Sequence, residues 1–151
     1  MPVSIKADLR PYQRDGVSWL AFLAKYQLHG ILCDGEPTQR YLGILANISL
    51  KDMGLGKSLQ TICIVSSKHH ERRVSRGSGA KEVSDLPSLI ICPPTLIGHW
   101  YHEILKFADN LKPFKYFGSS KEREALRRHF SKHDVIITSY EVVRADVEVL
   151  R

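Results

Sequence analysis

Three short runs of consecutive apolar residues constrain the fold of this chain more than any other feature. They are residues 29–33 (HGILC), 89–92 (LIIC) and 135–138 (VIIT), and residues 115–117 (KYF) are a possible further strand. Their apolar residues follow one another instead of alternating with polar ones, which is typical of strands that are covered on both faces. The runs therefore predict a buried parallel sheet.

Stretches with a helical spacing of apolar residues alternate with these runs. They are residues 9–23, 57–70, 96–107 and 121–130. Asp8 is the candidate N-cap of the first helix, with Pro11 in its first turn. Residues 71–86 are polar, basic and glycine-bearing, so we expect an exposed loop there. This alternation of strand and helix predicts an α/β fold, in which a parallel sheet is flanked by helices.

The segment KDMGLGKS, from Lys51 to Ser58, ends in the Gly-Lys-Ser of a phosphate-binding loop, and helix-compatible residues follow it. Glycines let backbone N–H groups turn toward phosphate oxygens, and a helix N-terminus adds positive partial charge. Lys57 is then the candidate to neutralise the phosphates, and Ser58 the candidate ligand of Mg²⁺. A lysine that caps an ordinary glycine turn is the alternative. It explains less, because turn, lysine, hydroxyl and helix occur together.

Two details depart from the general motif. The position that usually carries its first glycine holds Lys51, and the 17 residues 35–51 separate the first apolar run from the loop. In the general pattern, a strand leads directly into the loop.

Five blocks of sequence, in order, resemble Swi/Snf-type helicase-like ATPases. They are LRPYQ (9–13), GILCD (30–34), DMGLGKSLQ (52–60), ICPPTL (91–96) with Trp100 and Glu103, and ITSYE (137–141). The resemblance implies that residues 1–151 are the N-terminal part of a RecA-like P-loop NTPase lobe. Residues 29–34 and 93–100 most resemble the ATPases of this family that remove TATA-binding protein from DNA.

The resemblance also implies an ATP site that uses Mg²⁺. Gln13 matches the glutamine that reads the adenine edge, although the sequence alone favours a solvated glutamine on an amphipathic helix. The implied ATP-binding residues are Gln13, Asp52, Met53, Gly54, Leu55, Gly56, Lys57 and Ser58, with Lys57 catalytic and Ser58 the metal ligand.

Double-stranded DNA and TATA-binding protein are the partners that the resemblance implies, and the nucleus is the implied location. Thr95, Trp100, Thr138 and Ser139 lie in the blocks where such proteins approach the DNA backbone. For these residues, capping and core packing are the alternatives. Backbone contacts would provide affinity without reading the base sequence.

Residues 35–51 look like an insertion. Without them, Asp34 would join Asp52 in the unbroken family pattern ILCD-DMGLGKS. A retained intron or a faulty gene model is one hypothesis, and a genuine isoform with a remodelled ATP loop is another. Two functions follow. The chain is a fragment of an ATP-dependent DNA translocase, or it is an inactive module that docks on DNA or TATA-binding protein.

Catalytic competence of the polypeptide alone is a separate question. Residues 1–151 contain no Asp-Glu pair that could handle Mg²⁺ and water, and no second lobe with its transition-state arginines. Because hydrolysis needs these parts, we expect negligible ATPase activity from this polypeptide by itself.

Composition adds weaker indications. A formal charge of +6 suits a polyanionic partner, although the charge taken alone favours a solvated basic surface. The chain shows neither a secretory leader nor an apolar run of about 18 residues, so we expect the cell interior and no membrane.

For the cysteines, the histidines and one charged segment, the sequence favours structural interpretations over functional ones. Cys33, Cys63 and Cys92 form no C-x-x-C pair and are interpreted as reduced core thiols. No cluster of cysteines or carboxylates accompanies the histidine pairs 69/70, 99/102 and 129/133 to complete a metal site. Surface histidines are therefore favoured over metal ligands. Residues 121–124, with Arg127, Arg128 and Lys132, are expected to form a solvated helix face, and a DNA or partner contact is the alternative.

Overall fold

The computed structural model describes residues 5–30, 32, 56–78 and 86–150. The chain forms two compact units, one of residues 7–64 and one of residues 65–151 with residues 1–6. Of the strand predicted at residues 29–33, Ile31 and Cys33 lie outside the described residues. The predicted insertion at residues 35–51 and the loop residues 52–55 also lie outside them.

Helix α1 (Pro11–Lys25) belongs to the first unit. Its N-cap is Arg10, whose backbone N–H donates to Oε1 of Gln13 at 2.9 Å. The predicted place of Pro11 in the first turn is confirmed, whereas Asp8 as N-cap is wrong. Proline fits the first helical position because the N–H it lacks has no partner inside a helix. The cap is therefore the residue directly before Pro11.

Helix α2 (Lys57–Gly77) begins where the sequence predicts but continues past His70. Residues 71–77, which we expected in the exposed loop, are therefore helical. This extension makes its own contacts: Arg73 donates to the carbonyl of Asn110 and to Asp134, both at 2.6 Å. Tertiary hydrogen bonds thus extend a helix that local composition would end earlier.

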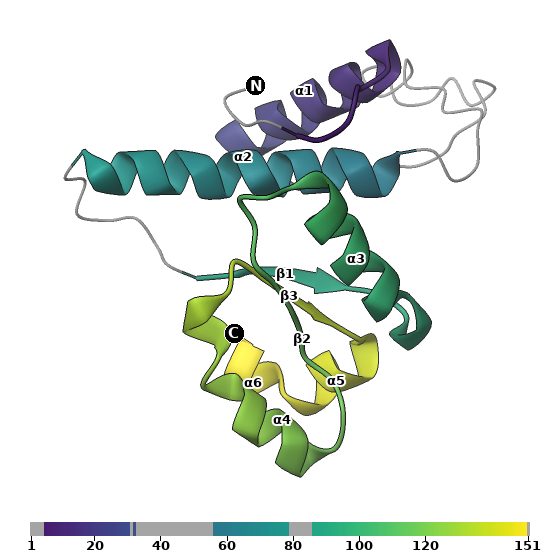
Figure 1. The fold of residues 1–151 in the computed structure, drawn as a ribbon, viewed down its shortest axis with the longest axis vertical. Coiled ribbons are helices and arrows are strands. Elements are labelled where there is room, and N and C mark those ends of the chain that lie inside the picture. Colours follow the sequence, from purple (N-terminus) through teal and green to yellow (C-terminus); the bar gives the residue numbers. More distant parts are fainter. Residues whose placement is uncertain (1–4, 31, 33–55, 79–85, 151) are drawn as a thin grey trace. The chain divides into compact units, whose positions relative to one another are not determined.

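Among the described residues, the second unit contains a sheet of three parallel strands in the order β1-β3-β2, namely β1 (Ser88–Ile91), β2 (Pro113–Lys115) and β3 (Val135–Thr138) (Figure 1). The parallel pairing is confirmed, and every residue of the central strand β3 is buried, as predicted. Strand β2 begins two residues earlier than predicted. Pairing starts upstream, where the N–H of Asp134 donates to the carbonyl of Lys112 at 2.9 Å.

Strand β1 departs from the prediction that both faces are covered. Leu89 and Ile91 are 39% and 36% exposed, because β1 lies at the end of the described strand order and pairs there with β3. Consecutive apolar residues therefore mark a strand correctly without showing whether both of its faces are covered.

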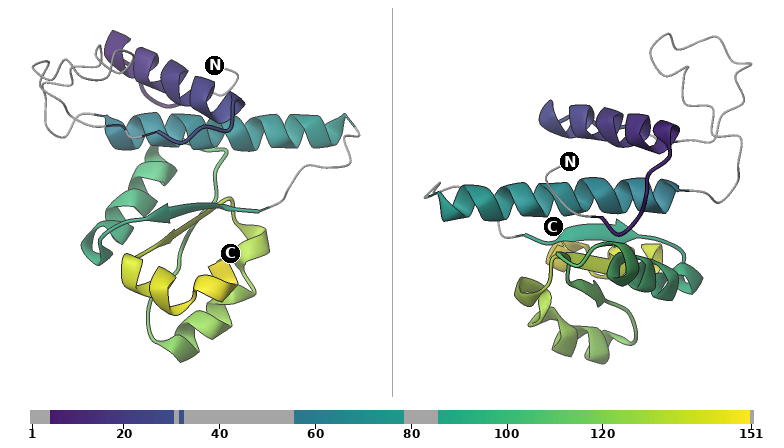
Figure 2. Two further views of the ribbon diagram at one scale, coloured as in Figure 1. Left: turned by 180° about the vertical axis from the view of Figure 1, so that it is seen from behind. Right: turned by 45° about the horizontal axis from the view of Figure 1, so that its top comes forward.

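Short helices surround the sheet. They are η1 (Pro94–Leu96), α3 (Ile97–Phe107), α4 (Ser120–Arg127), η2 (Phe130–Lys132), α5 (Tyr140–Ala145) and α6 (Val147–Leu150). Helix α3 packs on β2 and β3, whereas α5 and α6 lie on the other side of the strands (Figures 1 and 2). The helix predicted at residues 121–130 ends at Arg127, and a 3₁₀ turn follows.

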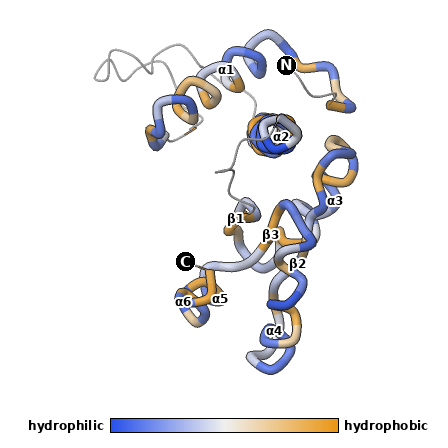
Figure 3. The backbone as a smooth tube through the Cα atoms, turned by 90° about the vertical axis from the view of Figure 1, so that its left-hand side faces the viewer, coloured by the Kyte–Doolittle hydropathy of each residue, from blue (hydrophilic) through white to orange (hydrophobic). Residues whose placement is uncertain are grey.

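One hydrophobic cluster in the core of this unit consists of Tyr116, Ile136 and Val142. Partly buried residues packed against it are Phe114, Leu126, Phe130 and Leu150. Strands β1 and β3 are coloured as hydrophobic in Figure 3. Each fully buried side chain of this size contributes about 1.5–3 kcal/mol to folding. None of the helices in the described ranges is long and apolar enough to cross a membrane.

Candidate functional site

Gln13 and Gly56 lie against each other where α2 begins. A Cβ added to Gly56 would stand 2.1 Å from Nε2 of Gln13, and the φ of Gly56 is +117°. Glycine is the residue that tolerates both this backbone conformation and this approach. Gln13 is only 6% exposed, so its interpretation as a solvated glutamine is wrong. The structure brings together the predicted adenine reader and the last glycine of the phosphate-binding motif.

A hydrogen bond orients the Gln13 side chain. Its Oε1 accepts the N–H of Arg10, which leaves Nε2 as the end of the amide that faces Gly56. The same hydrogen bond helps to start α1. The start of the helix and the direction of the Gln13 amide are therefore set together.

Lys57 and Ser58 are the first two residues of α2, and both are half-buried. The first intrahelical hydrogen bond runs from the N–H of Gln60 to the carbonyl of Gly56 at 2.9 Å. N–H groups in a first helical turn have no partner inside the helix and carry positive partial charge, which favours an anion. The helix start thus has the electrostatics that a phosphate requires. The predicted residues Asp52, Met53, Gly54 and Leu55 lie outside the described residues.

A second glutamine–glycine contact lies one helical turn away, and sequence reasoning missed it. Gln60 is completely buried, and a Cβ added to Gly16 would stand 1.9 Å from its Oε1. Within the part of the chain that the structure describes, neither Oε1 nor Nε2 of Gln60 has a hydrogen-bond partner. Residue type gives no signal for this burial, because glutamine is usually exposed.

The predicted DNA-contact residues lie at or beyond the carboxyl ends of β1 and β3, and Thr138 is the last residue of β3. Ile91 and Thr138 are register partners, and the N–H of Cys92 donates to the carbonyl of Thr138 at 3.0 Å. Thr95 follows β1 in η1 and is exposed, while Trp100 is half-buried in α3. Parallel α/β sheets bind ligands at this edge. A DNA contact by Thr95 and Trp100 stays a prediction.

Thr138 and Ser139 have internal roles. Thr138 is fully buried and donates its hydroxyl hydrogen to the carbonyl of Tyr116 at 2.7 Å. Ser139 is 4% exposed and is the N-cap of α5, where its hydroxyl oxygen accepts the N–H of Val142 at 3.5 Å. This is the packing and capping geometry that we considered as the alternative to DNA contact.

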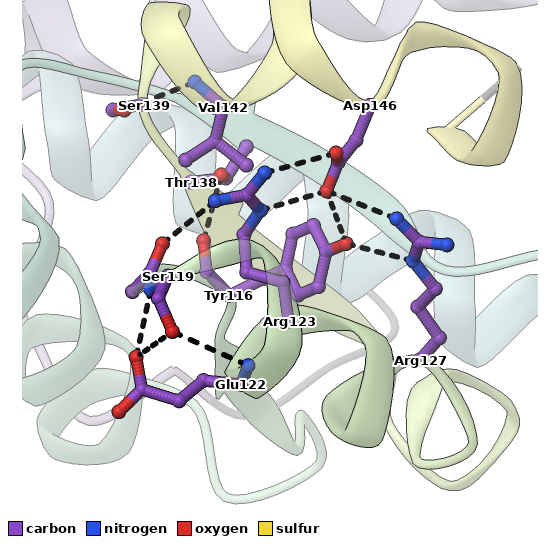
Figure 4. A network of polar contacts seen from close by, with 10 residues as sticks. Tyr116, Ser119, Glu122, Arg123, Arg127, Thr138, Ser139, Val142 and Asp146 are labelled. Carbon is purple, nitrogen blue, oxygen red and sulfur yellow. Dashed lines mark hydrogen bonds and ion pairs between the residues drawn. The ribbon is translucent and has the colours of Figure 1, made fainter.

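A buried ionic network joins α4 to the end of α5 (Figure 4). Nε and Nη2 of Arg123 donate to the two carboxylate oxygens of Asp146, at 2.8 and 3.0 Å. The Tyr116 hydroxyl donates to Oδ2 at 2.5 Å, and Arg127 lies 3.4 Å from the same oxygen. The expectation of a solvated face is therefore wrong for Arg123, which is 9% exposed.

The network changes the ionisation of its members. The hydrogen bond from Arg123 holds the pKa of Asp146 well below its usual value, even though burial acts in the opposite direction. Burial is the main cause that raises the pKa of the Tyr116 hydroxyl. Asp146 is thus a carboxylate at neutral pH and balances the charge of a buried guanidinium.

The histidines only partly follow the surface prediction. His99 is exposed and lies 3.5 Å from Glu103. His69 is buried, 3.0 Å from the Ser88 hydroxyl and 3.6 Å from Asp134, and burial lowers its pKa. The surface assignment is wrong for His69 because tertiary contacts with β1 and Asp134 cover it. Residues 129 and 133 are half-buried histidines beside the ring of Phe114.

The cysteine prediction is confirmed at two positions. Cys63 and Cys92 are free and buried, and burial raises the pKa of the Cys63 thiol to about 11. Cys33 lies outside the described residues. Over residues 5–30, 32, 56–78 and 86–150, no group of three or more His, Cys, Asp or Glu side chains is arranged to hold a metal ion.

Comparison with curated proteins finds similarity over nearly the whole chain. TATA-binding protein-associated factor mot1 of Schizosaccharomyces pombe is 48% identical over 151 residues, which are 99% of this chain and 7% of that protein. TATA-binding protein-associated factor 172 of Homo sapiens is 46% identical over 154 residues, which cover 100% of this chain and 7% of that protein. The chain thus spans a small part of the length of these relatives.

A solved structure and a family model agree with these similarities. The Sulfolobus solfataricus SWI2/SNF2 ATPase core in complex with dsDNA matches with a TM-score of 0.69 at 32% identity, over 98% of this chain and 25% of that chain. The predicted α/β, RecA-like fold is therefore confirmed. Residues 12–151 match the model of the SNF2-related domain. The chain belongs to the SNF2-related domain family.

Proposed function

We propose that this chain is the ATP-phosphate-binding part of an ATP-dependent DNA translocase that removes TATA-binding protein from DNA. The contact between Gln13 and Gly56 at the start of α2 carries the proposal. It joins a base-reading side chain to a phosphate-binding helix start in a chain of the SNF2-related family.

The residues present fit a nucleotide with its divalent metal. Gly56 combines a positive φ with a side-chain amide in the place of its missing Cβ, and α2 begins at the next residue. Lys57 would hold the phosphates, the Ser58 hydroxyl would ligate Mg²⁺, and the Gln13 amide would meet the adenine edge. Bound Mg²⁺ would supply positive charge that offsets the charge of the phosphates. Residues 52–55 would complete the loop.

The proposed partners are double-stranded DNA and TATA-binding protein, and the proposed location is the nucleus. The relatives are named as TATA-binding protein-associated factors, and the Sulfolobus solfataricus ATPase core forms a complex with dsDNA. The net charge of +6 is compatible with a phosphate backbone as ligand. Thr95 and Trp100, beyond the carboxyl end of β1, are the residues we propose for backbone contact.

The insertion of residues 35–51 before the loop favours a second candidate function. In this case the loop no longer grips ATP, and the chain is a docking module for DNA or TATA-binding protein. The two functions differ in nucleotide affinity, which can be measured directly.

Titration with a fluorescent ATP analogue tests the proposal. The chain of residues 1–151 and a variant without residues 35–51 are compared, each alongside its Lys57→Ala counterpart as a control. Mg²⁺-dependent binding by the intact chain that Lys57→Ala abolishes supports the ATP-binding function. Binding by the deletion variant alone supports the docking module. An absence of specific binding in both forms would overturn the nucleotide site.

A further inference from the structure

Helices α1 and α2 contact each other through a reciprocal arrangement of two glutamines and two glycines. Gln13 of α1 occupies the place of a Cβ at Gly56, and Gln60 of α2 occupies the place of a Cβ at Gly16. Each segment therefore supplies one glutamine and receives the other. All four residues belong to the unit of residues 7–64.

Helical spacing places both contacts on the same pair of faces. Gln13 and Gly16 are three residues apart on α1, and Gly56 and Gln60 are four residues apart at the start of α2. Residues with these separations are neighbours on one helix face. The two contacts are thus consecutive along the crossing of the helices, and a change at one alters the separation at the other.

The Gln60 amide group contributes little to the stability of the fold in this position. It is completely buried, and neither of its polar atoms has a hydrogen-bond partner among the described residues. A buried amide in this state costs free energy that an apolar side chain of equal length would avoid. The useful property of Gln60 is therefore the length of its side chain, which spans the space from α2 to Gly16, a residue without a Cβ.

We propose that Gln60 is a positioning residue for Gln13. It acts as a spacer, because its side chain lies against Gly16 and keeps α1 and α2 at a fixed separation. This separation sets the distance between the Gln13 amide and Gly56. The consequence for adenine recognition rests on the proposed function. The spacer itself does not, because the position of Gln13 can be observed without nucleotide.

Four variants separate length from polarity. Gln60→Ala removes the spacer, whereas Gln60→Met keeps an unbranched side chain of similar length without the amide. Gly16→Ala places a Cβ 1.9 Å from the present position of Oε1, so the Gln60 side chain has to leave its seat on residue 16 or the two elements have to separate. Gly98→Ala on α3 is the matched control, because a Cβ there meets nothing within 4 Å.

The first measurement follows the side-chain NH₂ resonances of the chain labelled with ¹⁵N-glutamine. The Gln13 signal is identified by its loss in Gln13→Glu, and exposed Gln27 is the internal reference. We expect Gln60→Ala and Gly16→Ala to move the chemical shift of the Gln13 NH₂ group toward that of the Gln27 NH₂ group. Gln60→Met and Gly98→Ala should leave it in place, and Gln60→Met should raise the melting temperature.

The second measurement is the ratio of ATP to GTP affinity in a form of the chain that binds nucleotide. Gln60→Ala and Gly16→Ala should lower this ratio on the order of tenfold, the factor for one lost hydrogen bond to the base. Gln60→Met should retain it. A general loss of packing would lower the affinities for ATP and GTP equally, so the ratio of the two affinities would not change.

An unmoved Gln13 signal in both Gln60→Ala and Gly16→Ala would overturn the positioning role, even if both variants melt earlier. The positioning role is also overturned if Gln60→Met shifts the Gln13 NH₂ signal as far as Gln60→Ala does. A moved signal with an unchanged ratio of ATP to GTP affinity would overturn the consequence for adenine recognition and would leave the spacer role in place. If Gln13 moves as expected but no form binds ATP, the spacer stands and the proposed function fails.

Discussion

Arg123 and Asp146 form a bidentate ion pair inside the unit that contains the sheet. Nε and Nη2 of Arg123 lie 2.8 and 3.0 Å from the two carboxylate oxygens of Asp146, and Nη1 donates to the carbonyl of Gly118 at 2.7 Å. Asp146 is the C-cap of α5, and Tyr116 directly follows β2. The pair therefore fastens α4 and α5 to the chain that leaves β2 (Figure 4).

Asp146→Asn should strongly destabilise the chain. It leaves the Arg123 guanidinium buried without a counter-charge, and the loss of one partner from a buried pair costs about 3–5 kcal/mol. Urea unfolding monitored by circular dichroism measures the change. Glu124→Gln, an exposed position on α4, is the control and should change stability by less than about 0.5 kcal/mol. Equal stability of the two variants would show that the pair is energetically neutral.

Acid should unfold the native chain partly through Asp146. Its pKa in the folded chain lies below that of an unfolded aspartate, which is about 3.9. A lowered pKa adds stability that is fully present above the unfolded value and is lost as the pH falls toward the folded one. The difference in unfolding free energy between the native chain and Asp146→Asn should therefore shrink below about pH 4.

The exposed carboxylates Glu122 and Glu141 also have lowered pKa values, because Ser119 and Ser139 respectively donate hydrogen bonds to them. They are present in both proteins, so the difference between the two unfolding curves isolates Asp146. A difference that stays constant from pH 7 to below pH 3 would contradict the role of this carboxylate.

Gly56→Ala should impair both stability and nucleotide binding. Its φ of +117° is strained for alanine, and the new Cβ would meet Nε2 of Gln13 at 2.1 Å. A strained backbone of this kind costs about 1–3 kcal/mol. Gly98→Ala, in open space on α3, should be neutral or stabilising by up to about 1 kcal/mol. Thermal melting compares the two, and a Gly56→Ala variant as stable as Gly98→Ala would refute the close approach.

ATP turnover by the 151-residue chain alone should equal that of its Lys57→Ala variant. These residues include no Asp-Glu pair for handling Mg²⁺ and water, so nucleotide binding would not lead to hydrolysis. Phosphate release measured with malachite green, with and without duplex DNA, checks this. DNA-stimulated turnover clearly above the Lys57→Ala level would show that the chain is catalytically sufficient.

Local sequence patterns determined the family of this protein, its central strand and the starts of its first two helices. The run at residues 135–138 is the central strand, α1 begins at Pro11, and α2 begins at Lys57 after the Gly-Lys-Ser motif. Each of these features depends on residues that are close in sequence. Apolar runs, a proline that fits the first helical turn and a glycine before a helix have the same local effect in many folds.

Tertiary structure alone decided which polar side chains are buried. Arg123 and Asp146 are 23 residues apart, and Gly16 and Gln60 are further apart still, so no local pattern relates them. Glutamine and arginine side chains are usually exposed. Their burial here depends on distant parts of the chain, because Asp146 supplies a counter-charge to Arg123 and Gly16 leaves space for Gln60. The central strand and the helix starts follow from neighbours in sequence, whereas the burial of these polar residues follows from neighbours in space.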